Sequence, residues 1–274
     1  AAAGLGLAGC SGSKTSEPAG SDAGSAKASS KKAVELQVFA ANSLEKALPE
    51  VQELYTEQTG TTFADTQFKA SGDLVEQMRA GAAVDVLITA SKGTMDDAET
   101  AELVDADTRE DMFVNDLVII RAEGSDTKVE AIADVANLDG KIAIGDAKTV
   151  PAGKYANQAL ASVGLYTGTE GDDGEYAPEI ADKVALADKV GTAASYVSTG
   201  DCVAGFVYSS DIFRYDGIEE AFVCPEDSHK PIVYPGAVAE SSEHADEAKA
   251  FIDFCLTNKK AQKIWAKYGF ELSE

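Results

Sequence analysis

The chain has few of the residues on which most catalytic and metal sites depend. Its 274 residues include only two histidines and four cysteines. The cysteine spacings do not match zinc-ligand pairs, and only His229 and His244 are available to complete such a set. Neither histidine stands in a recognisable catalytic motif, and no serine lies in a nucleophile elbow. The sequence therefore indicates recognition rather than catalysis, with no cofactor and no metal bound by side chains.

Positive charge is also scarce. The sequence has 23 lysines and arginines against 47 aspartates and glutamates, a net charge of −24. Such a surface repels phosphate backbones, so we expect no nucleic-acid partner. It also repels small anions at long range, so an anion site here has to act through short, pre-aimed hydrogen bonds. Solubility is the simpler interpretation of the acidic surface, and it stays open.

Long apolar runs are missing from the chain after its first residues. No later stretch reaches the roughly 18 apolar residues of a membrane span. Residues 1–10 are small and apolar and end in Leu7-Ala8-Gly9-Cys10, which resembles the end of a secretion signal with a bacterial lipobox. Residues 11–32 are rich in Ser, Gly, Ala and Lys and predict a flexible tether. We expect an extracytoplasmic protein lipid-anchored to the cell membrane through Cys10, although an incidental free cysteine is the alternative.

Three cysteines remain beyond the tether. Cys202 opens one apolar run and Cys224 ends another, so neighbouring strands would bring them together as a possible disulfide. Cys255 lies on the apolar face of a predicted helix and is expected to be buried. The sequence leaves open whether Cys202 and Cys224 are bridged.

From Val34 onwards, short apolar strands alternate with helices. We expect strands near 35–40, 61–68, 84–90, 116–120, 141–146, 183–187, 202–208, 219–225 and 230–238. The helices between them predict βαβ units and a largely parallel sheet. The order suggests two α/β lobes, one formed by 34–115 and 231–274 and the other by 116–230. Two strands would cross between these lobes, with a ligand cleft where strands end and helices begin.

Five separated stretches share one pattern, in which an apolar run stops, small residues follow, and a helix or turn begins. They span 36–48, 66–78, 142–160, 184–197 and 204–213. Helix N-termini carry free amides and a partial positive charge, which suits an anion. The residues at these points also have simpler roles: serine caps, an ordinary helix start, a core valine and a strand-edge tyrosine. They are Ser43, Ser71, Ala152, Val190 and Tyr208.

Together these motifs resemble the molybdate-binding proteins of bacterial and archaeal ABC importers. The similarity covers roughly 34–272 and rests on VFAANSL, FKASGDL, GAAVDVLITAS, IAIGDAKTVPAGKYA, GFVYSSD, CPEDSHKPIVYPGAV and KYGF. It implies the two-lobe type II periplasmic-binding-protein fold, an α/β fold with two crossover segments. Matched motif by motif, it also implies oxyanion contacts from the hydroxyl and backbone donors of Ser43 and Ser71, the backbone N–H groups of Ala152 and Val190, and the phenol of Tyr208.

The chain departs from the family pattern at a few positions. Asn42 and Lys69 stand where small residues are usual, Gly191 replaces a common arginine, and the acidic insert at 168–179 is long. With these departures, the resemblance still implies a binding protein, not an enzyme, that delivers molybdate or tungstate to a membrane permease. Nothing in the sequence demands an oligomer, so we expect a monomer. The alternatives are a binder of another oxyanion or small carboxylate, a secreted α/β hydrolase using Ser43 or Tyr208, and a cell-surface scaffold.

Overall fold

The computed structural model describes residues 33–273, which belong to one compact unit. The proposed lipidation site Cys10 and the predicted tether 11–32 lie outside the described residues. In the described part, no helix is both long enough and apolar enough to cross a membrane.

A mixed six-stranded sheet forms one half of the unit. The order across the sheet is β13 (Glu271–Leu272), β6 (Glu110–Asn115), β12 (Ile232–Val238), β5 (Val86–Ile88), β2 (Val38–Ala41) and β4 (Gln67–Lys69). Strand β2 runs parallel to both β4 and β5, whereas β12 is antiparallel to β5 and β6. A short parallel pair, β1 (Glu35–Leu36) and β3 (Thr62–Phe63), forms a separate two-stranded sheet.

A mixed five-stranded sheet forms the other half. Its order is β11 (Ile218–Val223), β7 (Leu117–Ala122), β10 (Ala204–Tyr208), β8 (Ile142–Gly145) and β9 (Val184–Ala187). Strand β8 is parallel to β9 and β10, while β7 is antiparallel to β10 and β11. The expected parallel arrangement therefore holds only where strands are joined through helices. The strands that carry the chain from one sheet to the other, β6, β7, β11 and β12, are all antiparallel to their neighbours.

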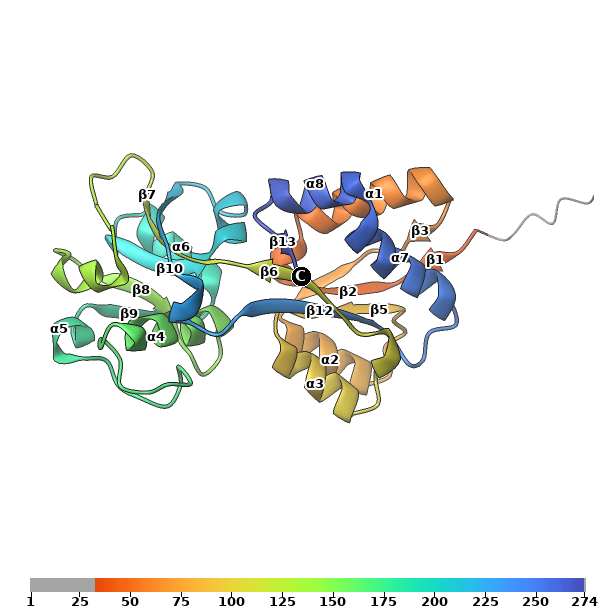
Figure 1. Cartoon of the computed structure of the whole chain (residues 1–274), viewed down its shortest axis with the longest axis horizontal. Coiled ribbons are helices and arrows are strands. Elements are labelled where there is room, and N and C mark those ends of the chain that lie inside the picture. Colours follow the sequence, from red (N-terminus) through yellow and green to blue (C-terminus); the bar gives the residue numbers. More distant parts are fainter. Residues whose placement is uncertain (1–32, 274) are drawn as a thin grey trace, which may run out of the picture. The chain divides into compact units, whose positions relative to one another are not determined.

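Helices cover both faces of the six-stranded sheet. Helices α1 (Ala47–Thr59), α7 (Ala245–Thr257) and α8 (Lys259–Lys267) pack together on one side, and α2 (Ser71–Arg79) and α3 (Lys92–Thr100) pack on the other (Figure 1). Neighbouring residues of one strand alternate between these layers: Val38 and Ala40 join the first cluster and Phe39 joins the second. This alternation is the two-residue period of a strand buried on both faces.

The five-stranded sheet has the same layered construction. Helix α4 (Pro151–Ser162) packs on one face and α6 (Val190–Ser198) on the other, with the short α5 (Pro178–Ala181) near the sheet end. In β7, Ile119 belongs to the α4 side, whereas Val118 and Ile120 belong to the α6 side. Short 3-10 segments complete the halves: η1 (Asn42–Leu44), η2 (Ala106–Thr108), η3 (Ile132–Asn137), η4 (Ser209–Phe213) and η5 (Glu226–Ser228).

The chain crosses between the two sheets twice. It leaves the six-stranded sheet at Asn115, the last residue of β6, and enters β7 at Leu117. It returns after β11 through η5 into β12, whose first residue, Ile232, pairs with Asn115. These crossings, the two sheets and their helices form the expected two-lobe type II binding-protein fold. Strand β6, helix α3 and strand β13 were not among the predicted elements.

The possible disulfide between Cys202 and Cys224, which the sequence left open, is not formed, because both residues, like Cys255, are buried free thiols. Strand β7 separates β10 from β11, so the two strands near the cysteines are not neighbours. They run in the same direction, with Cys202 before the start of β10 and Cys224 after the end of β11. The two thiols therefore lie at opposite ends of the sheet, beyond the ~7 Å separation of α-carbons that a disulfide spans.

Candidate functional site

One cavity collects all five residues singled out from the sequence. It has a volume of about 480 Å³ and is lined by Ser43, Ser71, Ala152, Val190 and Tyr208, among others. Ser43 and Ser71 follow β2 and β4 of the six-stranded sheet, and the other three follow or end β8, β9 and β10. Parallel neighbours end at the same sheet edge, so each sheet presents its strand ends to this one cavity.

Three helices of nine or more residues begin at the cavity. Helix α2 starts at Ser71, α4 at Pro151 and α6 at Val190. The first N–H groups of a helix have no acceptor within it, and the aligned peptide dipoles place about half a positive charge there. No side chain caps any of these three N-termini. Their arrangement suits a small anion held by backbone amides.

Gly153 allows the start of α4 to lie against the end of β8. A Cβ atom built on Gly153 would be 1.9 Å from the carbonyl oxygen of Gly145. No side chain fits at that separation, since the obstacle is backbone rather than a movable side chain. The glycine therefore sets the position of Ala152, its neighbour on the cavity wall.

Neither serine acts as the helix cap that an isolated serine would suggest. The hydroxyl of Ser43, which is 8% exposed, lies 2.8 Å from the Tyr234 hydroxyl. The hydroxyl oxygen of Ser71 accepts a hydrogen bond from the backbone N–H of Ala90 at 2.9 Å. Since the Ser71 oxygen already accepts this bond, its own proton is available to a group in the cavity.

Tyr208 places a buried phenol in the cavity wall. The residue is 6% exposed, and its hydroxyl has no hydrogen-bond partner among the described residues. Burial raises the pKa of Tyr208 well above its ordinary value, so the phenol keeps its proton at neutral pH. A buried hydroxyl normally has a partner. Tyr208 is thus a protonated donor with nothing in the described chain to receive its hydrogen bond.

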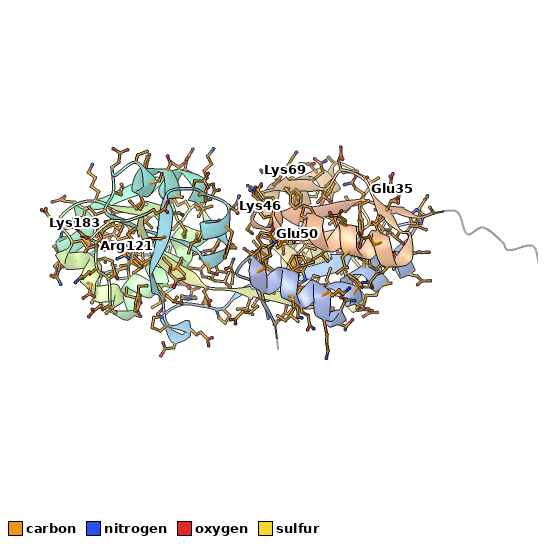
Figure 2. The ribbon with its side chains drawn as sticks, turned by 90° about the horizontal axis from the view of Figure 1, so that it is seen from above. Glu35, Lys46, Glu50, Lys69, Arg121 and Lys183 are labelled. Carbon is orange, nitrogen blue, oxygen red and sulfur yellow. The ribbon has the colours of Figure 1, made fainter. Side chains whose placement is uncertain are left out.

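The cavity is not free of charged side chains. Lys69, Lys189 and Arg214 line it, as do Asp73 and Asp188. Lys69 is exposed and ends β4, on the same half of the molecule as Lys46 and Glu50 (Figure 2). An exposed lysine is strongly hydrated and screened by salt, so it adds attraction without fixing a ligand in place.

Arg214 is a residue that sequence reasoning missed. Its side chain is 4% exposed; Nη1 donates to Asp211 at 2.8 Å, and Nε donates to Glu45 at 3.1 Å. Glu45 follows η1 of the six-stranded half, so this ion pair joins the two halves beside the cavity. Burial raises the pKa of Asp211, and Arg214 together with the Tyr208 N–H opposes that rise. The i, i+3 spacing of Asp211 and Arg214 after a buried strand was the signal that could have identified them.

Tyr215 occupies the space beside Gly191, the position where an arginine is usual in the resembled family. A Cβ atom on Gly191 would be 2.8 Å from the Tyr215 hydroxyl. The Arg214 guanidinium in turn lies 4.9 Å from the centre of the Tyr215 ring. The guanidinium at this end of the cavity therefore comes from Arg214, directly after η4, and not from a residue at the start of α6.

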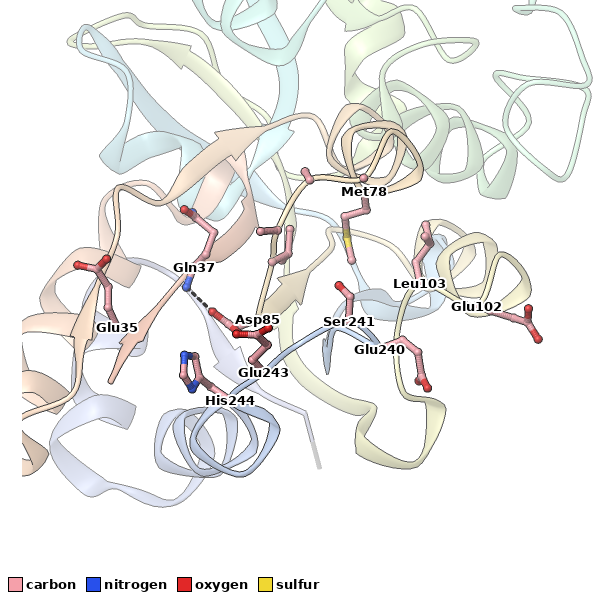
Figure 3. A pocket seen from close by; sticks show the side chains of 14 residues that line it. Glu35, Gln37, Met78, Asp85, Glu102, Leu103, Glu240, Ser241, Glu243 and His244 are labelled. Atoms are coloured by element: carbon pink, nitrogen blue, oxygen red, sulfur yellow. Dashed lines mark hydrogen bonds between the residues drawn. The ribbon is translucent and has the colours of Figure 1, made fainter. Parts of the chain in front are cut away.

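A second, larger cavity has the wrong charge for an anion. It measures about 660 Å³ and lies among β1, α2, β5 and the start of α7 (Figure 3). Five carboxylates line it, from Glu35, Asp85, Glu102, Glu240 and Glu243, with no lysine or arginine. Asp85 is held in place by the backbone N–H of Gln37 at 2.8 Å. This cavity contains none of the five residues expected from the sequence.

The smaller cavity shows neither a metal site nor a histidine among the residues that the structure describes. Within residues 33–273, no group of three or more His, Cys, Asp or Glu side chains is arranged to hold a metal ion. Neither histidine lines the cavity, and the Ser43 hydroxyl contacts a phenol rather than a base. The described site therefore offers hydrogen-bond donors but no nucleophile activated by a histidine.

Comparison with known proteins agrees with this picture. Residues 36–271 match the family model described as bacterial extracellular solute-binding protein. The molybdate-binding protein of Escherichia coli K12 is 32% identical over 242 residues, covering 86% of this chain and 89% of that protein. A putative ABC transporter substrate-binding lipoprotein of Bacillus subtilis 168 is 30% identical, covering 92% of each.

Solved structures show the same similarity. The substrate binding domain of a putative molybdenum ABC transporter from Clostridium difficile superposes with a TM-score of 0.74 at 33% identity, covering 88% of this chain and all of that one. The periplasmic molybdate-binding protein of Azotobacter vinelandii gives a TM-score of 0.70 at 21% identity, covering 87% and 100%. The second likeness bears on the fold alone.

Proposed function

Because the chain belongs to the bacterial extracellular solute-binding proteins, we propose that its ligand is molybdate or tungstate and that it serves an ABC importer. The ligand would lie between two lobes, one formed by residues 34–115 and 231–274 and the other by 116–230. Ser43, Ser71 and Tyr208 would donate through hydroxyls, and Ala152 and Val190 through backbone N–H groups. The names of its relatives support this substrate class.

The unpartnered hydroxyl of Tyr208 is the observation that carries the proposal. It lines the same cavity as the starts of α2, α4 and α6. A buried donor without an acceptor costs about 1 to 3 kcal/mol, so its presence favours a ligand that accepts. The free N–H groups at these helix starts are donors as well, and a fully ionised oxyanion offers acceptors only. Asp73 and Asp188 also line the cavity, so the groups that favour an anion are the hydroxyls and the backbone N–H groups rather than the lining as a whole.

The donors are numerous enough for tight binding. A hydrogen bond to a charged group contributes roughly 1.5 to 3 kcal/mol, and micromolar affinity corresponds to about 8 kcal/mol. Five such bonds sum to roughly 7.5 to 15 kcal/mol, and most of that range exceeds the micromolar figure before the costs of ordering and closure are subtracted. Contacts from both halves also stabilise a closed arrangement through their differential affinity.

Titration calorimetry with molybdate, tungstate and sulfate tests the proposal. We expect sub-micromolar binding of molybdate or tungstate and weaker binding of the smaller sulfate, because fixed donors select ligand size. Equal affinity for all three anions would point to a general oxyanion binder, and no heat with any of them would refute the assignment. Native mass spectrometry of untreated protein gives an independent readout, namely a bound mass of molybdate or tungstate.

A matched pair of serine variants locates the binding site. Ser43→Ala with Ser71→Ala removes two donors from the cavity and should weaken molybdate binding by several kcal/mol. Ser91→Ala would be one control, because Ser91 caps α3 by accepting from the Thr94 N–H at 3.2 Å. Ser91 also lines the cavity, however, so its loss could affect binding. Ser162→Ala is therefore the cleaner control, since its hydroxyl donates to Ala159 O at the far end of α4. Its affinity should equal that of the wild type.

The extracellular family description places the protein outside the cytoplasm. We further propose that Cys10 carries a lipid, that the cell membrane holds the protein through this anchor, and that the protein acts as a monomer. The permease of the importer would receive the anion. Cys10→Ser should move the protein from the membrane fraction to the soluble fraction of expressing cells. An unchanged membrane fraction would remove the anchor from the proposal.

A further inference from the structure

A buried polar network lies where the chain crosses between the sheets, directly behind the cavity. Asn115 ends β6, Tyr234 lies in β12, and Ser209 and Ser210 begin η4. The amide nitrogen of Asn115 donates to Ser210 Oγ at 2.9 Å and to the Tyr234 hydroxyl at 3.2 Å. The Tyr234 hydroxyl lies 2.8 Å from Ser43 Oγ, on the cavity wall. Both crossover strands thus connect to the Ser43 hydroxyl.

The orientation of the Asn115 amide follows from its backbone neighbour. The N–H of Asp116 donates to Asn115 Oδ1 at 3.0 Å, and a backbone N–H has no other role. The Ser209 hydroxyl lies 2.7 Å from the same oxygen and 3.0 Å from the Gly269 carbonyl oxygen, and its single proton is shared between these two acceptors. A flipped amide would set its NH₂ against the Asp116 N–H, donor against donor. The group facing Tyr234 is therefore the NH₂, which only donates.

The direction of the Tyr234 hydrogen bond follows in turn. Its oxygen accepts from Asn115, and the remaining neighbour within hydrogen-bond distance is Ser43. Tyr234 is fully buried, so a phenol proton without an acceptor would be costly. Donation from Tyr234 to Ser43 satisfies both groups. Burial also raises the pKa of Tyr234, which keeps that proton on the phenol.

We propose that the chain Asn115 → Tyr234 → Ser43 is a polarised hydrogen-bond relay that leaves the Ser43 proton free to point into the cavity, so that Asn115 and Tyr234 act as positioning residues for oxyanion selection. The proposal rests on the function proposed above. With its oxygen occupied as an acceptor, Ser43 presents a donor to the ligand. It therefore favours an ionised oxyanion and disfavours a ligand that must donate there.

The Ser71 hydroxyl has the same hydrogen-bond direction as the Ser43 hydroxyl, although a different partner determines it. Its oxygen accepts from the Ala90 N–H, a group that only donates. Ser43 and Ser71, the two serines proposed to contact the ligand, thus both accept through their oxygen and keep their proton free. At Ser71 the backbone N–H of Ala90 sets the direction of the hydroxyl hydrogen bond. At Ser43 the Tyr234 side chain, which is distant in the sequence, sets that direction.

A double-mutant cycle tests the relay by molybdate calorimetry of the full chain. Tyr234→Phe should weaken binding about tenfold in the wild-type background, because Ser43 loses its donor. In the Ser43→Ala background the same change should alter affinity by no more than about twofold, since the relay then has no end group. A general structural role of Tyr234 would cost the same affinity in both backgrounds.

Asn115→Asp provides a second variant of nearly the same shape. A carboxylate at 115 only accepts, so Tyr234 would donate to it and Ser43 would donate to Tyr234, turning the Ser43 lone pairs toward the anion. The added charge costs affinity in either background. The relay predicts that the cost is about fivefold or more larger when Ser43 is present.

Tyr166→Phe is the matched control. Tyr166 is 6% exposed, and its hydroxyl accepts from the Gly174 N–H at 2.8 Å, away from the cavity. This variant should lose thermal stability and keep the wild-type affinity. If wild-type protein does not bind molybdate, the proposed function falls and the relay with it. If wild type binds, Ser43→Ala weakens binding, and the losses from Tyr234→Phe and Asn115→Asp are the same in both Ser43 backgrounds, the relay alone is overturned.

Discussion

Replacing Tyr208 with phenylalanine should change stability and affinity in opposite directions. The phenol is buried, and its hydroxyl has no partner among the described residues. Removing an unpaired buried hydroxyl relieves a desolvation cost, whereas removing a donor to a bound anion forfeits a charge-assisted hydrogen bond. If Tyr208 contributed only to packing, the substitution would not change stability and affinity in opposite directions.

The magnitudes follow from the burial of the hydroxyl. Without ligand, Tyr208→Phe should raise the free energy of unfolding by about 1 kcal/mol, the low end of the cost of an unpaired buried group. For a chain of this length, that corresponds to a rise in Tm of about 2 to 4 °C. With molybdate, the loss of one bond to a charged group is worth about 1.5 to 3 kcal/mol, or about 10- to 150-fold in Kd.

Differential scanning calorimetry and titration calorimetry measure both effects on the same protein. The variant should melt higher than wild type without ligand, and its stabilisation by a fixed excess of molybdate should be smaller. Tyr166→Phe serves as the reference, since that hydroxyl has a backbone partner and its loss should lower Tm. A Tyr208→Phe protein that melts lower and binds with unchanged affinity would refute the reasoning, because the hydroxyl would then have a structural partner and no ligand.

Three further predictions concern the walls of the site and the buried thiols. Gly153→Ala should destabilise the protein by more than about 2 kcal/mol in urea unfolding and weaken molybdate binding, because the new methyl group overlaps the Gly145 carbonyl. A variant with normal stability would show that α4 shifts freely. Arg214→Met should cost about 3 to 5 kcal/mol by leaving the fully buried Asp211 unpaired, whereas Glu45→Gln, at a partly exposed partner, should cost less than about 1 kcal/mol. Equal losses would contradict the buried pair. Burial raises the pKa of Cys224 to about 12, so stability from this thiol is complete below about pH 8.5 and falls as pH rises towards 12. Cys224→Ala should flatten the alkaline decline, and an identical pH profile would exclude this thiol as its source.

Much of the fold could be predicted from the sequence because the strands are buried on both faces. Their central stretches, such as 86–88 and 204–208, carry no polar side chain other than the Tyr208 phenol, as expected for strands between two helix layers. The places where strands stop and helices begin were also visible, because Pro151 and the small residues near Ser71 mark helix starts. The structure brings these starts to one cavity, as the sequence had led us to expect.

Strand neighbours were less accessible to prediction. The sequence shows that runs near Cys202 and Cys224 are strands but not that β7, which begins at Leu117, lies between them. Sheet order depends on contacts between segments far apart in the chain, and no local period reports it. For this reason the sequence left the pairing of Cys202 with Cys224 open, and the sheet order decides against it.

The donor direction at Ser43 shows most clearly what local patterns leave out. A serine directly after a strand predicts a helix cap, and the residues around Ser43 indicate no other role for its hydroxyl. Its actual partner, Tyr234, is 191 residues away and is itself set by Asn115 at the other crossover. A hydroxyl can donate or accept, so its role in a binding site is decided by whichever neighbour can do only one of the two. Here that neighbour is the Asp116 N–H, which fixes the Asn115 amide. In the proposed relay, the donor direction of a cavity residue thus depends on a backbone group outside the cavity lining, at the segment where the two halves of the protein join.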